Sequence, residues 1–410
     1  MSTINHPDVV IIGGGILGCA IARYLSQTPN LHIVVVERHG LGEQTTSHAA
    51  ALLTRVRPHR VLTDMVMETF RAIDELGSYL GEQLPLKRVG SLQVSAKPEG
   101  RRQIEQTSQR AADAGVLAER LSADEGMRLA PWLELTPDTS ALWLPDDGYI
   151  DPYTLCQAYA AEARSKGTRF LLKREVSELL QQGSTVTGVR LTDGEMISAG
   201  TVIDAAGPWS TALAMQAGIH LGMAPVRSHY WISSPHPKIS VHGPMTILPD
   251  SGAYARPEVG GLLFGLRDPQ SVVAHPKALP DNLHGFRFDT DPTGELALES
   301  GYEALRCQLS VLEELRLAHY VSNVSSYTPD GFALLGPMPG IDGFIAATGC
   351  SGGGIGMSGG IGRLIAELAT NQSPFVPPEP FRLDRFGDID SYSPDFIRRC
   401  AEARARKRTG

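Results

Sequence analysis

Near its start the chain reads DVVIIGGGILG at residues 8–18, and IVVVE follows at residues 33–37. The first apolar run is long enough for one buried strand, and it meets the pattern G-x-G-x-x-G. A helix-compatible stretch, residues 19–26, leads to the second apolar run, which ends in the acid Glu37. This order of strand, glycine turn, helix, strand and acid predicts a βαβ unit that binds a dinucleotide.

Each glycine of the pattern has a physical task. Gly13 permits the tight turn after the strand, Gly15 lets the backbone approach a pyrophosphate, and Gly18 lets helix and strand pack closely. The helix N-terminus offers free N–H groups and a positive dipole end to the phosphates. Glu37 stands where a ribose 2′-hydroxyl is bound and would repel a 2′-phosphate, which favours NAD or FAD over NADP. The alternative is a glycine-rich turn in another α/β protein.

The composition is that of an ordinary globular protein, with 410 residues, 42% hydrophobic and 20% charged. This length predicts two domains. The formal net charge of −8 gives no reason to expect nucleic acid or an anionic membrane as partner. We expect no signal peptide and no membrane span. The cysteines are scattered without C-x-x-C spacing, which argues against a metal site and favours a cytoplasmic location.

Hydrophobic periodicity places further elements along the chain. Helices are predicted at residues 62–80, 98–115, 153–166, 209–217, 301–315 and 361–368, and Ser122 starts another with a capping box. Strands are predicted at residues 90–96, 169–172, 186–191 and 201–204, and a mainly β region at 225–264. The arginine-rich tail, residues 393–410, is predicted to be a solvated, frayed helix, with a basic anchor as the alternative.

Five more motifs join the opening pattern. They are TTSHAAA at 45–51, VIDAAGPWS at 202–210, YARP at 254–257 with GGLLFG at 260–265, TPDG at 328–331 with LGP at 335–337, and ATGCSGGG at 347–354. Together they resemble the D-amino acid oxidase family of FAD-dependent amine oxidoreductases. That group includes glycine oxidase, sarcosine oxidase and dehydrogenase, dimethylglycine dehydrogenase and D-amino acid dehydrogenase. The resemblance extends to about residue 385.

The resemblance implies an α/β plus α+β fold of the glutathione reductase type. It implies an FAD-binding Rossmann-like domain and a mainly antiparallel β substrate domain. The expected FAD-binding domain is discontinuous, and the boundaries are 1–85, 146–222 and 325–390 for the FAD-binding domain, 86–145 and 223–324 for the substrate domain, and 391–410 for the basic tail.

The family implies FAD rather than NAD. Residues 13–18 would meet AMP and the pyrophosphate, Glu37 the ribose, the backbone of Val176 the adenine, and residues 350–356 the flavin pyrimidine, where N–H groups at a helix start stabilise negative charge. The alternative for this last glycine run is close helix packing, above all at Gly359 and Gly362. The residues assigned to FAD are Gly13, Gly15, Ile16, Leu17, Gly18, Glu37, Arg38, Thr46, Ser47, His48, Ala49, Val176, Ala206, Gly207, Trp209, Gly349, Ser351, Gly352, Gly353, Gly354, Ile355 and Gly356.

The chain departs from its family at the substrate carboxylate. Members that bind amino acids often carry an arginine where this chain has Ser325. Either another arginine replaces it or the substrate has no carboxylate there, and arginine suits because its planar fork pairs with both carboxylate oxygens. The candidate replacements are Arg55, Arg57, Arg227, Arg256 and Arg267.

Flavin attachment and the electron acceptor depend on three further positions. Residues 322–327 lack the cysteine that holds the flavin in monomeric sarcosine oxidase. His48 lies in a loop where dimethylglycine dehydrogenase uses a histidine, so a covalent link through His48 is an alternative to non-covalent FAD. Leu263 occupies the position of the oxygen-activating lysine of sarcosine oxidase, which favours a dehydrogenase over an oxidase.

The reaction implied is hydride transfer from the carbon next to a nitrogen onto flavin N5, followed by hydrolysis of the imine. The acceptor would be oxygen, a quinone or another carrier. The predicted catalytic or substrate-contacting residues are Tyr254, His48, Arg256, Arg55, Arg267 and Tyr327, with Tyr230 as a weaker choice. Three alternatives remain: a 2-hydroxy acid dehydrogenase, the catalytic β-type subunit of a hetero-oligomeric amine oxidase or dehydrogenase, and a non-enzymatic flavin-binding protein.

Overall fold

The computed structural model describes residues 6–406, whose strands form two large sheets and two small ones. The first large sheet has six strands in the order β18-β19-β12-β1-β2-β8, parallel except for the edge strand β18. The strands are β1 (Val9–Ile12), β2 (Ile33–Glu37), β8 (Arg169–Leu172), β12 (Thr201–Asp204), β18 (Leu334–Pro337) and β19 (Phe344–Thr348). The opening βαβ unit is confirmed, with helix α1 (Ile16–Leu25) between β1 and β2.

Both faces of this sheet are covered, which explains its continuous apolar strands. Successive side chains of a strand point to opposite faces. Val9 and Ile11 pack toward the helices, whereas Val10 and Ile12 pack toward a three-stranded antiparallel sheet. The helices are α1, α2 (Arg60–Leu80), α5 (Pro152–Ser165) and α8 (Ser358–Ala369); the small sheet is β9 (Val176–Gln182), β10 (Thr185–Leu191) and β11 (Met196–Ser198).

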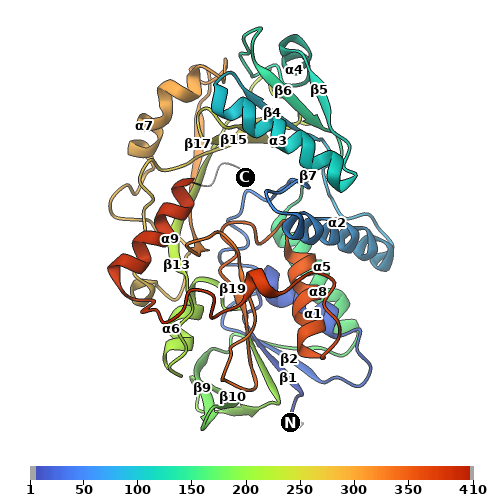
Figure 1. Cartoon of the computed structure of the whole chain (residues 1–410), viewed down its shortest axis with the longest axis vertical. Helices are drawn as coiled ribbons and strands as arrows, with labels where there is room; N and C mark the ends of the chain where they lie inside the picture. The colour runs from blue at the N-terminus through green and yellow to red at the C-terminus, as the bar shows by residue number, and fades with distance from the viewer. Residues whose placement is uncertain (1–5, 407–410) are drawn as a thin grey trace.

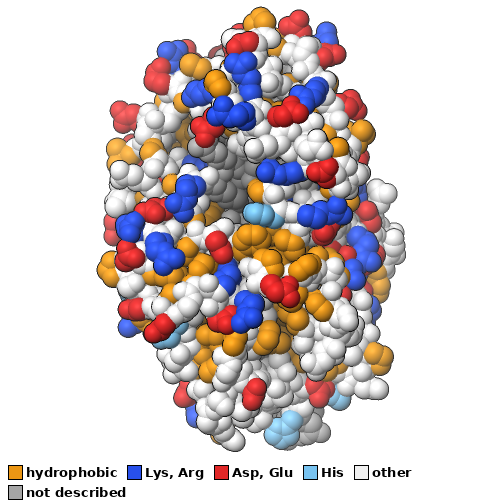
Figure 2. All heavy atoms as spheres, in the orientation of Figure 1, with side chains coloured by type: hydrophobic (Ala, Val, Ile, Leu, Met, Phe, Trp, Pro, Cys, Tyr) orange, Lys and Arg blue, Asp and Glu red, His pale blue; other side chains and the backbone are white. Residues whose placement is uncertain are grey.

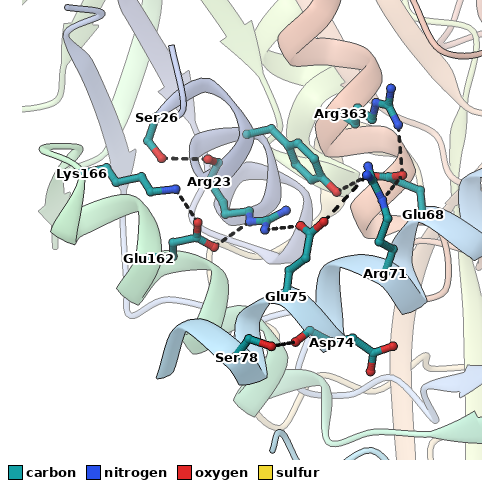
Figure 3. Close-up of polar contacts among 11 residues, drawn as sticks. Arg23, Ser26, Glu68, Arg71, Asp74, Glu75, Ser78, Glu162, Lys166 and Arg363 are labelled. Carbon is teal, nitrogen blue, oxygen red and sulfur yellow. Dashed lines mark hydrogen bonds and ion pairs between the residues drawn. The ribbon is translucent and has the colours of Figure 1, made fainter. Parts of the chain in front are cut away.

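Buried charges join the helices of this layer, and each is paired. The guanidinium of Arg23 on α1 donates to Glu162 of α5 and to Glu75 of α2, each at 2.7 Å (Figure 3). Glu68 of α2 accepts from Tyr24 at 2.6 Å and from Arg363 of α8 at 3.2 Å. Burial of such groups is tolerated because every charge has a partner.

The second large sheet has eight strands and lies above the first in Figure 1. Its order is β17-β13-β16-β15-β14-β4-β6-β5, antiparallel except where β14 runs parallel to β4, so the expected mainly antiparallel sheet is confirmed. The strands are β4 (Ser91–Ser95), β5 (Glu119–Leu121), β6 (Ser140–Leu144), β13 (Ala224–Ser233), β14 (Met245–Leu248), β15 (Ala253–Glu258), β16 (Gly261–Leu266) and β17 (Leu317–Tyr327). The domain boundaries stay a prediction, and β17 runs past the one expected at 324.

Short elements complete the chain. A small antiparallel sheet pairs β3 (Leu52–Leu53), which precedes β4 in the chain, with β7 (Gly148–Tyr149), which follows β6. The remaining helices are α3 (Pro98–Ala114), α4 (Ala123–Leu129), α6 (Ser210–Met215), α7 (Glu295–Arg306) and α9 (Pro394–Arg406), with 3-10 turns at Gly207–Trp209, Pro276–Ala278 and Glu379–Phe381. The capping box at Ser122 is present, because its hydroxyl and the Glu125 carboxylate satisfy each other's backbone N–H.

Two sequence predictions are wrong. The helix expected at 301–315 is α7, which begins at Glu295 and ends at Arg306, because the chain then turns so that Leu309 bridges to Leu133. The tail expected to be a solvated helix is instead packed: α9 lies along β13 and β17 with Phe396, Ile397 and Cys400 buried (Figure 1). None of the helices within 6–406 combines the length and the apolar character needed to cross a membrane.

Candidate functional site

A cavity of about 630 Å³ lies between the two large sheets. Its floor is formed by residues that follow the carboxyl ends of the parallel strands: Gly13 after β1, Glu37 at the end of β2, Ala205 after β12, and Gly349 after β19. In open α/β sheets ligands bind at this edge. The opposite wall comes from the eight-stranded sheet, through Ser228, Tyr254, Arg267, Asn323, Ser325, Ser326 and Tyr327.

The glycine turn at one end of the cavity is held by short backbone contacts. The Gly13 N–H donates to the Val36 carbonyl at 2.8 Å, and the Gly14 N–H donates to the Glu37 carboxylate at 2.7 Å. A Cβ on Gly13, whose φ is +99°, would lie 2.6 Å from the Ala205 carbonyl oxygen. A Cβ on Gly18 would lie 1.9 Å from the Gly13 oxygen, so Gly18 serves helix-to-strand packing and does not itself line the cavity.

The wall beside Glu37 is aromatic and charged. The Arg38 guanidinium lies 4.1 Å from the Trp209 ring centre, a cation–π contact, and 3.4 Å from the Glu175 carboxylate. The Trp209 indole donates to the Pro280 carbonyl at 3.0 Å, which fixes the ring. Val176, Ala206 and Gly207 also line this part of the cavity. These groups form a flat slot beside the acid.

A buried acid supports this end from below. The Asp204 carboxylate accepts from the Ala206 N–H at 3.0 Å and from the Ser210 hydroxyl at 2.7 Å, through the same oxygen. Its second oxygen is buried and has no partner among the residues that the structure describes. Burial raises the pKa of Asp204 to about 6.

The glycine-rich loop after β19 forms the middle of the cavity. Gly349, Gly352, Gly353, Gly354, Ile355 and Gly356 all line it, while Ser351 points away and its N–H donates to the Ser326 carbonyl at 2.8 Å. The two later glycines, Gly359 and Gly362, are required for a different reason, which is the close approach of other helices. A Cβ on Gly359 would lie 2.7 Å from the Thr69 backbone, and one on Gly362 would lie 2.9 Å from the Ala20 backbone. Close helix packing therefore explains these two positions.

The far end of the cavity carries hydroxyls and guanidinium groups. Tyr254, Tyr327 and Ser325 line it together with Arg267 and with Arg404 of α9. Burial raises the pKa of Tyr254 and of Tyr327, so both phenols stay protonated and can donate a hydrogen bond. The Arg404 guanidinium lies 5.7 Å from the Tyr327 ring centre.

Several residues predicted for the site lie outside the cavity lining, and for most of them local partners hold the side chain. His48 Nδ1 lies 2.8 Å from the Gln44 carbonyl, and the Ser47 hydroxyl donates to the Glu43 carbonyl at 2.9 Å, so both turn back onto their own loop. The Arg55 guanidinium stacks 3.7 Å from the Phe70 ring centre. The predicted residues outside the cavity lining are Gly18, Ser47, His48, Ser351, Arg55, Arg227, Arg256 and Tyr230.

Arg256 and Arg227 both lie outside the cavity lining, where other residues hold them. The Arg256 Nε donates to the Ala50 carbonyl at 3.0 Å, and the guanidinium lies 4.4 Å from the Tyr149 ring centre. The Arg227 guanidinium is buried between Asp268 and Asp291, with an oxygen of each carboxylate at 3.2 Å from a guanidinium nitrogen. Of the five arginines proposed from the sequence, Arg57 and Arg267 line the cavity.

Sequence reasoning missed Arg404, although its helix carried a usable signal. Phe396, Ile397, Cys400 and Arg404 fall on one helical face, and all four are buried. An apolar stripe at this spacing indicates a packed helix. Other lining residues that were not predicted include Gln44, Thr45, Arg174, Glu175, Thr192, Ser228 and Lys277.

A second cavity of about 600 Å³ adjoins the first and shares Arg57, Tyr327, Cys350 and Gly353 with it. Helices α2, α3 and α9 contribute its outer wall, through residues such as Leu62, Arg102 and Arg406. Figure 2 shows that this face of the molecule is hollowed in its upper half, with Lys and Arg side chains around the hollow. No cluster of His, Cys, Asp or Glu that could hold a metal occurs between residues 6 and 406.

A protein-family model described as "FAD dependent oxidoreductase" matches residues 8–368, which is most of the chain. The chain belongs to this family. FAD is the cofactor that membership implies. The fold and the cavity agree with that assignment, because a cavity of about 630 Å³ is within the usual range for cofactor sites.

Two characterised relatives are similar over almost the whole chain. One is the 4-methylaminobutanoate oxidase (formaldehyde-forming) of Paenarthrobacter nicotinovorans, 29% identical over 389 residues, covering 93% of this chain and 46% of the relative. The other is the mitochondrial dimethylglycine dehydrogenase of Mus musculus, 26% identical over 420 residues, covering 99% of this chain and 46% of the relative. The chain thus spans about half the length of these relatives.

Solved structures share the fold. The L-proline dehydrogenase of P. horikoshii superposes with a TM-score of 0.81 at 22% identity, covering 94% of this chain and all of the other. The residues present also fit FAD. Gly15 lines the cavity, and a Cβ there would meet only the Thr46 hydroxyl at 3.3 Å, so the backbone of the turn is open to a pyrophosphate. Glu37 and Trp209 line a slot suited to a nucleoside.

Proposed function

We propose that the protein uses FAD to oxidise the C–N bond of an amino acid or N-substituted amino acid, such as a glycine-, sarcosine-, D-amino acid- or opine-like compound. The product would be an imine that hydrolyses to a carbonyl compound and an amine. One observation carries the proposal. A single cavity joins the glycine turn at Gly13 to an end lined by Tyr254, Tyr327 and Arg267.

The residues that would hold FAD follow the cavity from end to end. Backbone N–H groups around Gly15 would face the phosphates, Glu37 the ribose, and the glycines after β19 the flavin. The chemistry that bound FAD would supply here is acceptance of the hydride from the carbon next to the substrate nitrogen. We propose that the cofactor is held non-covalently, because His48 is directed at the Gln44 carbonyl of its own turn.

The substrate end supplies orientation and no strong base. The protonated phenols of Tyr254 and Tyr327 would donate hydrogen bonds to the substrate, and Arg267 would attract a negative group. An amine that binds in its neutral form needs no base to remove a proton. The carboxylates among the lining residues, Glu37 and Glu175 included, belong to the nucleotide part of the cavity.

A dehydrogenase is favoured over an oxidase in this proposal. Leu263 stands where the resemblance assigned an oxygen-activating lysine, and its apolar side chain is 1% exposed within β16. The acceptor would then be a quinone or another carrier. Because the chain spans about half of its relatives, a role as one subunit or one part of a larger amine-oxidising assembly remains the second candidate.

The test is anaerobic reduction of the FAD-loaded protein by a panel of amino acids, N-methyl amines, opines and 2-hydroxy acids. We expect at least one nitrogen compound to bleach the flavin band near about 450 nm, and the hydroxy acids to leave it unchanged. Bleaching by hydroxy acids alone would contradict the proposal and favour a 2-hydroxy acid dehydrogenase. If dithionite reduces the flavin but no member of the panel does, oxidation of amines is rejected. That result would favour a non-enzymatic role.

Two simpler measurements sharpen the proposal. Acid denaturation should release all flavin into the supernatant, and flavin retained in the pellet would point to the covalent alternative at His48. After reduction by the best substrate, admission of air should reoxidise the flavin slowly, and a soluble quinone should reoxidise it fast. Equal rates would favour an oxidase.

A further inference from the structure

The last helix is fixed to the substrate sheet. Helix α9 lies along β13 and β17 in Figure 1, and its Phe396, Ile397 and Cys400 pack in one apolar cluster with Ala224 and Tyr327. A helix held by buried side chains places its remaining residues at defined positions. Arg404 is one of them, two turns beyond Ile397 on the buried face.

Arg404 is a buried cation that faces the cavity. Its side chain is 7% exposed, and it lines the cavity beside Tyr327 and Ser325. Across residues 6–406, no carboxylate lies within ion-pair distance of it and no hydrogen bond of its guanidinium is found. Burial of a charge without a partner is costly. A partner that arrives from the cavity would remove that cost.

The surroundings of Arg404 favour an anion. Two cations, Arg404 and Arg267, act on the buried phenol of Tyr327, together with the thiol of Cys350. Arg267 also lines the cavity. A negative group beside Tyr327 would therefore be attracted by the guanidinium of Arg404. Ser325 lines the same wall, but its side chain is short and uncharged, so it cannot form an ion pair with a carboxylate.

We propose that Arg404, carried in by the last helix, binds the carboxylate of the substrate, so that the substrates are amines that bear a carboxylate. The proposal rests on the proposed function for the identity of the substrate. It makes α9 part of the active site. The planar guanidinium of Arg404 can donate two parallel hydrogen bonds to a carboxylate.

The experiment measures binding of two matched probes to the FAD-loaded full chain. 2-Furoate carries a carboxylate, and 2-furamide has nearly the same shape without the charge. Binding is followed by the shift of the flavin spectrum and by calorimetry. The variants are Arg404→Gln and Arg404→Lys, and the control is Arg399→Gln, an exposed arginine on the same helix.

We expect Arg404→Gln to weaken 2-furoate binding by about 10- to 100-fold, the usual value of a charged hydrogen-bond pair, and to leave 2-furamide binding unchanged. Arg404→Lys should retain part of the affinity, and Arg399→Gln all of it. Equal affinity of wild type and Arg404→Gln for 2-furoate would overturn the proposal. So would an equal loss for both probes, because that would indicate a change of cavity shape, and so would absence of 2-furoate binding to the wild type.

The outcome can be separated from that of the proposed function. If no amine reduces the flavin but 2-furoate binding depends on Arg404, the reaction is wrong and the anion site stands. If amines reduce the flavin and Arg404→Gln binds 2-furoate normally, the reaction stands and the assignment of Arg404 fails. If Arg404→Gln loses FAD, the test is made with Arg404→Lys. Weaker 2-furoate binding and unchanged 2-furamide binding in Arg404→Lys would support the proposal. Unchanged binding of both probes would overturn it.

Discussion

The two ends of the cavity are built in different ways. At the dinucleotide end, one stretch of chain supplies the turn at Gly13, the acid Glu37 and Thr46, whose hydroxyl accepts from the Ile16 N–H at 3.0 Å, and residues after β12 complete the wall. The substrate end brings together Tyr254 from β15 and Arg404 from α9, which lie far apart in the chain. The glycine turn of the first end therefore follows from local backbone geometry, whereas the second end depends wholly on long-range packing.

The difference extends to charge. In the layer of helices on the six-stranded sheet, the buried Arg23 pairs with Glu75 and Glu162. In the substrate half, Arg227 is paired with Asp268 in the same way, but Arg404 has no carboxylate partner in the described part of the chain. Paired charges hold the structure together, and the unpaired one is free to meet a ligand.

The largest expected effect is at the glycine turn. Gly13→Ala forces a Cβ to within 2.6 Å of the Ala205 carbonyl at a φ of +99°, so the turn must open. We expect FAD affinity to fall on the order of 1,000-fold or more. The control is Gly194→Ala, which has a φ of +89° and no atom within 4 Å of the added Cβ. Flavin fluorescence titration measures both, and equal affinities would show that the collision is unimportant.

This asymmetry explains what the sequence could predict. Gly13, Gly18 and Glu37 were correctly placed in one βαβ unit because a short motif contains the geometry of its own turn. The arginines were harder. Arg55 and Arg267 were equal candidates, yet the first stacks on Phe70 and the second lines the cavity, which depends on partners distant in sequence.

The last helix shows the same limit. Its composition is basic, which favoured a solvated tail, and the few apolar residues on one face decided otherwise. That face packs only because β13 and β17 offer an apolar surface to it. The sequence of the tail alone gives no information about that surface. Helix α7 was misplaced because its ends depend on Gly294 and on the bridge at Leu309.

The second prediction compares two buried arginines of the substrate half. Arg227→Met leaves Asp268 and Asp291 buried without their cation, and we expect a loss of about 4 kcal/mol in the free energy of unfolding. Arg404→Met removes a cation with no described carboxylate partner, so we expect the free energy of unfolding to be unchanged or slightly higher. Urea unfolding of the FAD-loaded proteins measures both. A similar loss in the two variants would mean that Arg404 has a structural partner.

The third prediction concerns the buried acid at the dinucleotide end. The pKa of Asp204 is raised by burial from its ordinary value of 3.8 to about 6, so the folded state binds a proton more tightly than the unfolded chain. The resulting stability is complete below about pH 4 and is lost as pH rises to about 6, by at most about 3 kcal/mol.

The measurement is the difference between wild type and Asp204→Asn in the free energy of unfolding, taken from pH 4 to pH 7. The asparagine is neutral throughout, so the wild type should lose more stability than the variant over this range. Asp289→Asn, an exposed aspartate, should behave as wild type. Parallel curves for wild type and Asp204→Asn would mean that Asp204 is ionised in the folded state.

The smallest expected effect tests whether the two ends act separately. Tyr254→Phe removes a protonated hydroxyl from the substrate end, and loss of one hydrogen bond to the substrate should lower kcat/KM by about 10-fold. FAD affinity should be unchanged, since Tyr254 comes from β15 and not from the glycine turn. Tyr302→Phe, on α7 and outside the cavity lining, should alter neither quantity. If Tyr254→Phe lost as much FAD affinity as kcat/KM, the two ends of the cavity would not bind their ligands independently. The two ends would then differ in how the chain forms them but not in how they bind FAD and substrate.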